Sequence, residues 1–141
     1  MSAFQVVYLP VGVGTFHMES AWAEFEKSRA LLKALDARLC CPEELLLSVD
    51  SLAAFLEDKK PDLVIFQNVT FANAAYMTEV LARCDAPMLL WTLREPMIDG
   101  GRLRLNSLTG AYSAASTLTA FGRPFAYVFG APEEERVKCY I

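Results

Sequence analysis

Histidine and clustered positive charge are scarce in this sequence. His17 is the only histidine in 141 residues, so an all-histidine metal site or a serine–histidine relay would depend on that one residue. The chain has 13 Lys and Arg against 17 Asp and Glu, for a formal charge of −4, and its longest basic run is Lys59-Lys60. Nucleic-acid binding requires a footprint of basic side chains on the phosphates. We therefore expect no nucleic-acid partner.

Long hydrophobic runs are missing as well. No apolar run approaches the ~20 residues that span a bilayer. The N-terminus shows no positive segment followed by an apolar stretch and a cleavage site, which is the pattern of a signal peptide. We expect a cytoplasmic protein without a membrane partner.

Cysteines are present, but they lack the spacing that metal or redox chemistry requires. Cys40, Cys41, Cys84 and Cys139 form no Cys-x-x-Cys pair. The adjacent pair Cys40-Cys41 is also poor geometry for a disulfide. We expect all four to be buried, reduced thiols that pack as small hydrophobic side chains.

Apolar residues, in contrast, are abundant. Hydrophobic residues make up 54% of the chain and charged residues 21%, which excludes disorder. The length fits one domain. Free-standing domains usually contain about 45–50% apolar residues even with glycine counted. This excess of apolar residues predicts one of two things. Either the core is buried on both faces, or some of the protein surface is covered by something else.

Short apolar runs alternate with helical patterns along the whole chain. We expect strands at residues 4–9, 37–41, 63–66, 88–91 and 125–129, and helices capped by Ser20, Asp50 and Asn106, with a further helix near 75–84. This alternation predicts right-handed crossovers between parallel strands. The expected fold class is α/β: a doubly wound, mainly parallel, five-stranded flavodoxin-like or Rossmann-like three-layer sandwich of order 2-1-3-4-5. Residues 1–105 would form the flavodoxin-like domain, and 106–141 would complete the sheet or open the next domain.

In such sheets ligands bind beyond the carboxyl ends of the strands, so the following loops are the candidate sites. The first loop contains Gly12 and Gly14, but His17 stands where a dinucleotide fingerprint has its third glycine, and Cys40-Cys41 stands where it has an acidic residue. Dinucleotide binding is therefore disfavoured. Two interpretations stay open: the glycines only let the loop turn, or His17 is a polar residue of a pocket.

Two further loops carry groups suited to a small polar ligand. Gln67, Asn68 and Thr70 follow the third expected strand, and amides that both donate and accept suit a neutral polyol. Turn and capping hydrogen bonds account for the same residues equally well. Trp91 ends the fourth strand and precedes Arg94-Glu95, which indicates either an aromatic platform with a charged pair or a core tryptophan with a surface ion pair. No set of carboxylates converges on a metal or catalytic site.

The loops resemble the N-terminal region of the L-fucose/L-arabinose isomerase family. The resemblance rests on residues 61–71, 86–96, 106–110 and 122–125, and it extends over roughly residues 4–135. Members of this family are cytosolic, manganese-dependent aldose–ketose isomerases that assemble as oligomers. Their chains are several times longer, and their metal-binding and proton-transferring carboxylates lie in later domains. The resemblance therefore implies a substrate-recognition and assembly domain that is inactive alone.

What the resemblance implies for single residues is a sugar-binding surface without catalytic residues, metal ligands or a cofactor of its own. Mn²⁺ is expected only in the full-length protein, together with a small-molecule aldose or ketose and further copies of the chain. Fucose isomerases tend to have an arginine in the first loop, where this sequence has His17. The rival hypotheses are a free-standing flavodoxin-like module for a nucleotide or flavin, and a pure assembly module. The predicted sugar-facing residues are Phe16, His17, Gln67, Thr70, Phe71 and Trp91.

Overall fold

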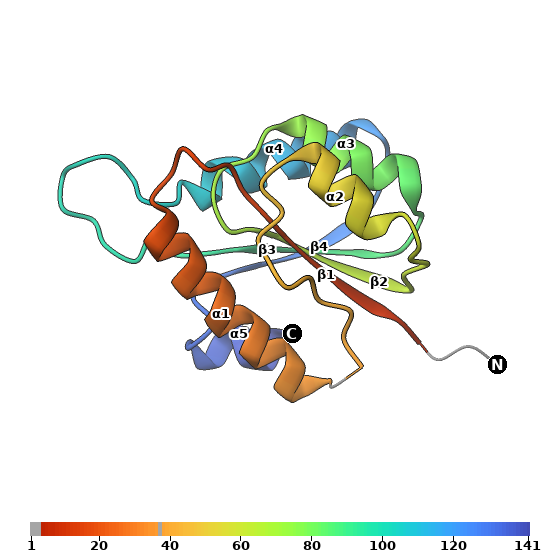
Figure 1. Ribbon diagram of the computed structural model, residues 1–141, viewed down its shortest axis with the longest axis horizontal. Coiled ribbons are helices and arrows are strands. Elements are labelled where there is room, and N and C mark those ends of the chain that lie inside the picture. Colours follow the sequence, from red (N-terminus) through yellow and green to blue (C-terminus); the bar gives the residue numbers. More distant parts are fainter. Residues whose placement is uncertain (1–3, 37) are drawn as a thin grey trace.

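The computed structural model describes residues 4–36 and 38–141 (Figure 1). Parallel strands and helices alternate along the chain, as the apolar pattern predicts. The elements are β1 (Val6–Val11), α1 (Met18–Leu35), α2 (Val49–Leu56), β2 (Leu63–Asn68), α3 (Ala74–Arg83), β3 (Met88–Thr92), α4 (Ser107–Ala120), β4 (Phe125–Phe129) and α5 (Glu135–Tyr140).

The strands form one parallel sheet of order β1-β2-β3-β4 between two layers of helices. Val7 pairs with Val64 in β1 and β2, and the last strand joins through the pair Met88 and Phe125. Helices α2, α3 and α4 cover one face, and α1 and α5 cover the other (Figure 1). The α/β class and the parallel sheet are therefore confirmed.

The described sheet has four strands, and the expected five are not found. The weak strand at 37–41 is the one that is missing, and residue 37 lies outside the described residues. Cys40 and Leu46 each make an isolated bridge to β1, with Tyr8 N donating to Cys40 O at 2.9 Å and Leu46 N donating to Pro10 O at 2.9 Å. Pro42 lies between these two contacts and has no N–H to donate, so the segment follows the edge of β1 without forming a ladder.

Helices on both faces explain why the strand sequences are continuously apolar. Alternate residues of β2 point to opposite sides, so Phe66 packs beneath α2, α3 and α4, whereas Ile65 packs beneath α1 and α5. Every residue of β3 is buried. A core of two halves therefore accounts for much of the apolar excess in the composition.

Part of the remaining apolar surface lies on α4 and β4. Leu108 and Tyr112 of α4 expose 42% and 70% of their surface, and Tyr127 of β4 exposes 41%. These three residues line one pocket, and we call them the α4–β4 patch. Other exposed apolar side chains lie elsewhere, and Ile98, between β3 and α4, is 79% exposed. β4 is also an edge strand, because it pairs with β3 and, within the described residues, with no other strand. The segment 125–129 thus joins the sheet as its last strand, and the outer edge of this strand pairs with no other strand among the described residues.

The four cysteines are free thiols, and only three are partly shielded. Cys40, Cys41 and Cys84 are half-buried, and burial raises the pKa of Cys41 to about 11. None of the four is fully buried, which corrects the expectation of buried thiols, and Cys139 is exposed. It faces away from the core because Val137 occupies the inward side of the short helix α5. No helix among the described residues has the length and apolar character to cross a membrane.

Candidate functional site

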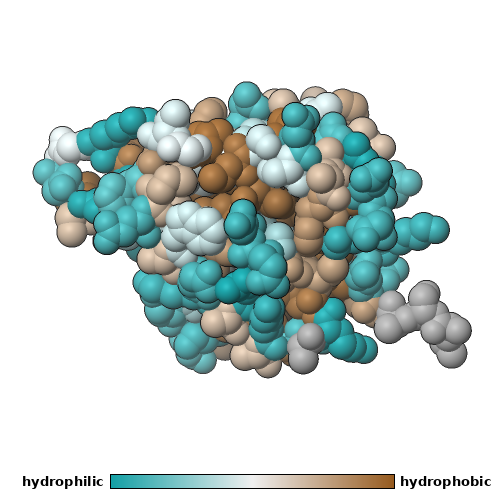
Figure 2. All heavy atoms as spheres, viewed as in Figure 1, coloured by the Kyte–Doolittle hydropathy of each residue, from teal (hydrophilic) through white to brown (hydrophobic). Residues whose placement is uncertain are grey.

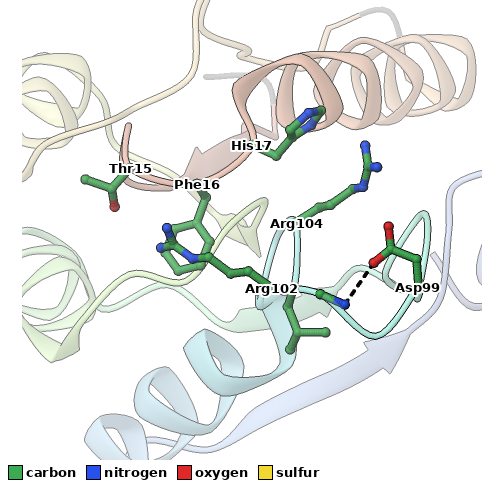
Figure 3. Close-up of a pocket in the computed structure, with 8 residues that line it drawn as sticks. Thr15, Phe16, His17, Asp99, Arg102 and Arg104 are labelled. Carbon is green, nitrogen blue, oxygen red and sulfur yellow. Dashed lines mark hydrogen bonds between the residues drawn. The ribbon is translucent and has the colours of Figure 1, made fainter.

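A pocket of about 380 Å³ lies where the β1–α1 loop meets the β3–α4 loop (Figure 3). Both loops follow the carboxyl ends of parallel strands, the edge at which ligands bind in folds of this kind. Its volume is in the range of small-molecule sites. The β3–α4 loop projects away from the sheet (Figure 1), and the face of it seen in Figure 2 is mainly hydrophilic, although Met97, Ile98 and Leu103 are exposed. The lining residues are Thr15, Phe16, His17, Asp99, Gly101, Arg102, Leu103 and Arg104.

His17 connects the two loops and begins helix α1. Its Nδ1 accepts a hydrogen bond from Ser20 N at 3.3 Å and lies 2.7 Å from Ser20 Oγ. The cap of α1 is therefore His17, which corrects the prediction that Ser20 caps this helix. The backbone N–H of His17 donates to Arg104 O at 3.0 Å. With Nδ1 engaged by Ser20, Nε2 is the ring nitrogen that stays free to bind a ligand.

Two arginines of the β3–α4 loop supply the positive charge of the pocket. The guanidinium of Arg102 lies over the Phe16 ring, 4.7 Å from its centroid. Arg104 extends on the side of His17 (Figure 3) and donates to Met97 Sδ at 3.4 Å. Within residues 4–36 and 38–141, neither arginine forms an ion pair. Most of their donors are therefore available to a ligand.

Glu95 fixes the base of the arginine loop. Its carboxylate accepts hydrogen bonds from the backbone N–H groups of Arg104 at 3.0 Å, Leu105 at 3.2 Å and Asn106 at 2.6 Å. Phe71 N donates to Leu105 O at 2.8 Å, and the Leu105 side chain is fully buried. Glu95 thus has a structural role, because its carboxylate accepts hydrogen bonds from the backbone of the loop. The expected Arg94–Glu95 pair is wrong, because Arg94 pairs with Glu134 at 2.9 Å.

The β1–α1 loop is held by close approach to the end of β2. Thr70 Oγ1 accepts from Val13 N at 2.9 Å. A Cβ at Gly12 would meet that same Oγ1 at 2.7 Å, whereas a Cβ at Gly14 would meet nothing within 4 Å. Gly12 is therefore required by packing, and Gly14 is not. Neither glycine has a positive φ angle.

The structure brings some of the predicted sugar-facing residues together and separates others. Phe16 and His17 line the pocket, and Phe71 stacks at an angle on Phe16 with ring centroids 6.3 Å apart. Thr70 lies fully buried behind the β1–α1 loop. The roles of these residues toward a sugar stay predictions.

Gln67 and Trp91 are held in the core instead. Gln67 is fully buried, donates to Ser28 Oγ at 3.0 Å and accepts from Tyr8 Oη. Trp91 Nε1 donates to Gly130 O at 3.0 Å, and its ring has no exposed surface. Both side chains point toward α1 and α5, because they occupy the strand positions between those that face α2, α3 and α4. Their polar groups are therefore engaged within the protein, away from the pocket.

Arg102 and Arg104 are pocket residues that no sequence pattern singled out, whereas Asp99-Gly100-Gly101 is a turn signal. They belong to the irregular stretch between β3 and α4, where no periodicity indicates which side chains point inward. Two arginines at alternate positions next to Gly100-Gly101 are the signal that the sequence contains. Asp99 Oδ1 accepts from Gly101 N at 3.0 Å and thereby shapes the turn.

A metal centre does not fit the residues described here. Residues 4–36 and 38–141 contain no group of three His, Cys, Asp or Glu side chains that could hold an ion. The pocket itself has one histidine and one carboxylate, and its other charged groups are arginines, which repel cations. The arrangement is suited to binding a polar, anionic small molecule.

Known proteins with similar sequences match nearly the whole of this chain. A sulfoquinovose isomerase of Clostridium sp. (strain MSTE9) is 61% identical over 138 residues, which is 97% of this chain and 31% of that protein. The relatives are isomerases. Those of Priestia aryabhattai and Alkalicoccus urumqiensis, also sulfoquinovose isomerases, are 40% and 37% identical over 94% of the chain, which covers 30% of each. No family model matches the chain.

The similarity extends over nearly the whole chain but less than a third of each relative. The predicted relationship to an isomerase is confirmed by these relatives. An N-terminal domain of a longer isomerase fits this partial coverage. Membership of the L-fucose/L-arabinose isomerase family stays a prediction.

Proposed function

We propose that this chain is the substrate-recognition and assembly domain of an aldose–ketose isomerase whose substrate is sulfoquinovose. The observation that carries the proposal is the 61% identity to a sulfoquinovose isomerase over 97% of the chain. The polar pocket at the carboxyl edge of the sheet supports it, because that edge is where the fold places ligands. The L-fucose/L-arabinose isomerases that the chain resembles catalyse the same type of reaction, which is the interconversion of an aldose and its ketose.

The catalytic groups belong, in this proposal, to the remaining part of the longer polypeptide. The chain spans about 30% of the length of its relatives. The residues described here do not fit the manganese ion that the family resemblance implies. The domain would therefore bind and orient the sugar, and the ion and the groups that move protons would come from elsewhere in the protein.

An isomerisation assay tests this assignment. The full-length polypeptide that carries this chain should convert sulfoquinovose to its ketose when manganese is supplied, and the chain of 141 residues alone should not. The ketose is measured by NMR, which separates it from the starting aldose. Ketose formation by the isolated chain would overturn the domain assignment, and a full-length protein that leaves sulfoquinovose unchanged would overturn the substrate.

The α4–β4 patch supports an assembly role, with a second copy of the full-length protein as its partner. Soluble monomers rarely expose large contiguous apolar patches, and edge strands are normally protected by charges or proline. β4 has neither, since its sequence is Phe-Ala-Tyr-Val-Phe. This side of the sheet thus lacks the usual protection against association, and the resemblance implies oligomers.

Sedimentation equilibrium of the full-length protein tests the assembly role. The native protein should sediment as an oligomer, and the double variant Tyr112→Glu/Tyr127→Glu should shift toward monomer, because two charges would be buried at the interface. Tyr140→Glu is the matched control, because Tyr140 is 54% exposed on α5, outside the patch. A monomeric native protein, or a double variant that stays associated, would contradict this role.

A further inference from the structure

Thr70 lies where the β1–α1 loop meets the β2–α3 loop, at the edge of the sheet that carries the pocket. Its side chain has no exposed surface, and it is not among the residues that line the pocket. Its Oγ1 accepts a hydrogen bond from Val13 N at 2.9 Å and donates one to Phe71 O at 3.0 Å. A hydroxyl can accept and donate at the same time. One buried hydroxyl therefore bonds the two loops to each other.

Phe71 extends this connection to the third loop of the site. Its N–H donates to Leu105 O at 2.8 Å, in the β3–α4 loop. The β3–α4 loop is in turn bonded to the first loop, because His17 N donates to Arg104 O at 3.0 Å. Each of the three loops is therefore hydrogen-bonded to the other two, and Thr70 supplies one of these connections.

Phe16 is the pocket residue whose place depends on these connections. It lies in the sequence between Val13 and His17, the two residues through which the first loop is bonded to its neighbours. Its ring stacks at an angle on Phe71, with centroids 6.3 Å apart, and the guanidinium of Arg102 lies 4.7 Å from its centroid (Figure 3). The ring thus contacts both of the other loops, so its position follows from how the three loops are spaced.

We propose that Thr70 is a positioning residue, whose hydroxyl sets the place of the Phe16 ring in the pocket without touching the sugar. This inference rests on the proposed function, which assigns the pocket to the sugar. Without the hydroxyl, the N–H of Val13 and the carbonyl of Phe71 would each lose a partner, and buried groups of this kind are costly to leave unpaired. The loops would then separate to admit water, and the Phe16 ring would move with them.

Steady-state kinetics of the full-length protein with sulfoquinovose test the role. Thr70→Ala should raise KM by roughly 3- to 10-fold, the equivalent of one net hydrogen bond, with little change in kcat. Thr70→Ser keeps the hydroxyl and should return KM to nearly its native value. Thr78→Ala is the matched control, because the hydroxyl of Thr78 donates within α3, to Ala74 O at 2.8 Å. Tyr76 Oη donates to Gly12 O at 3.1 Å and leaves the loop a second anchor, so Thr70→Ala should fold, which circular dichroism checks.

A double-mutant cycle with Phe16→Leu shows whether Thr70 acts through the aromatic ring. If it does, Thr70→Ala should add little to the KM of the Phe16→Leu variant, because coupled residues are not additive. The amides of residues 12–17 should also exchange their protons faster in Thr70→Ala, as measured by hydrogen-exchange mass spectrometry. Fully additive effects on KM, or a raised KM with unchanged exchange, would overturn the positioning role.

The outcomes separate this inference from the proposed function. An active native protein whose KM is unchanged by Thr70→Ala would overturn the inference alone. A native protein that does not isomerise sulfoquinovose would overturn the function, and hydrogen exchange would then decide on Thr70. Faster exchange in Thr70→Ala that Thr70→Ser reverses would support the inference, and unchanged exchange would overturn it.

Discussion

Trp91→Ala is expected to lower the free energy of unfolding by about 3–5 kcal/mol, the range for removal of a large buried aromatic side chain. Trp91 is the penultimate residue of β3 and has no exposed surface, so its loss leaves a cavity that the sheet and its helices cannot close. The change also leaves Gly130 O without its donor. Urea denaturation followed by circular dichroism measures the difference.

Two further tryptophan variants show whether Trp91 acts on stability or on the sugar. Trp91→Phe keeps most of the ring volume but removes the donor to Gly130 O, which should cost about 1–3 kcal/mol. Trp22→Phe is the matched control, because Trp22 is 36% exposed and should change stability by no more than about 0.5 kcal/mol. If Trp91→Phe left stability unchanged and weakened sugar binding, Trp91 would be a ligand contact and the structural role would be wrong.

The strands and their parallel order were predictable because the sheet is buried on both faces. Continuous apolar runs such as 63–66 and 88–91, with helical segments between them, are typical of parallel strands that helices cover on both sides. The segment 37–41 was mispredicted because it is short and followed by Pro42. Its contacts with β1 depend on tertiary packing that no local pattern records.

The candidate site was predictable in its location but not in its residues. Loops after parallel strands are the right place to search, and Phe16 and His17 do line the pocket. Gln67 and Phe71 looked equivalent in the sequence because each follows or ends the same strand. Gln67 is still within β2 and turns beneath α1, whereas Phe71 lies three residues beyond the end of β2, in a loop that reaches the β1–α1 loop.

The arginines of the pocket were missed for a different reason. Their positions depend on Glu95, whose carboxylate binds three backbone amides up to eleven residues further along the chain. In the sequence, Glu95 next to Arg94 looks like half of a local ion pair. In the folded loop its partners are backbone N–H groups. Every residue except proline has such a group, so the sequence does not indicate which ones Glu95 binds.

Glu95→Ala is therefore expected to disorganise the arginine loop. The change removes the acceptor of the Arg104, Leu105 and Asn106 amides, and hydrogen bonds to a charged group are worth about 1.5–3 kcal/mol each. Solvation of the freed amides offsets part of this loss, so we expect a net destabilisation of about 2–3 kcal/mol. The same three amides should exchange their protons faster, which hydrogen-exchange mass spectrometry measures on peptides that cover the loop.

The function of the full-length protein should change with the loop. Because Glu95 does not line the pocket, its loss should raise KM for sulfoquinovose through Arg104 while kcat changes little. Glu95→Gln keeps one acceptor oxygen and should lie between the native protein and Glu95→Ala. Glu43→Ala is the matched control, since its exposed carboxylate contacts only Arg29, at 3.5 Å, among the described residues. If Glu95→Ala accelerated exchange in the loop without raising KM, the loop would be held by Glu95 but would not bind the sugar.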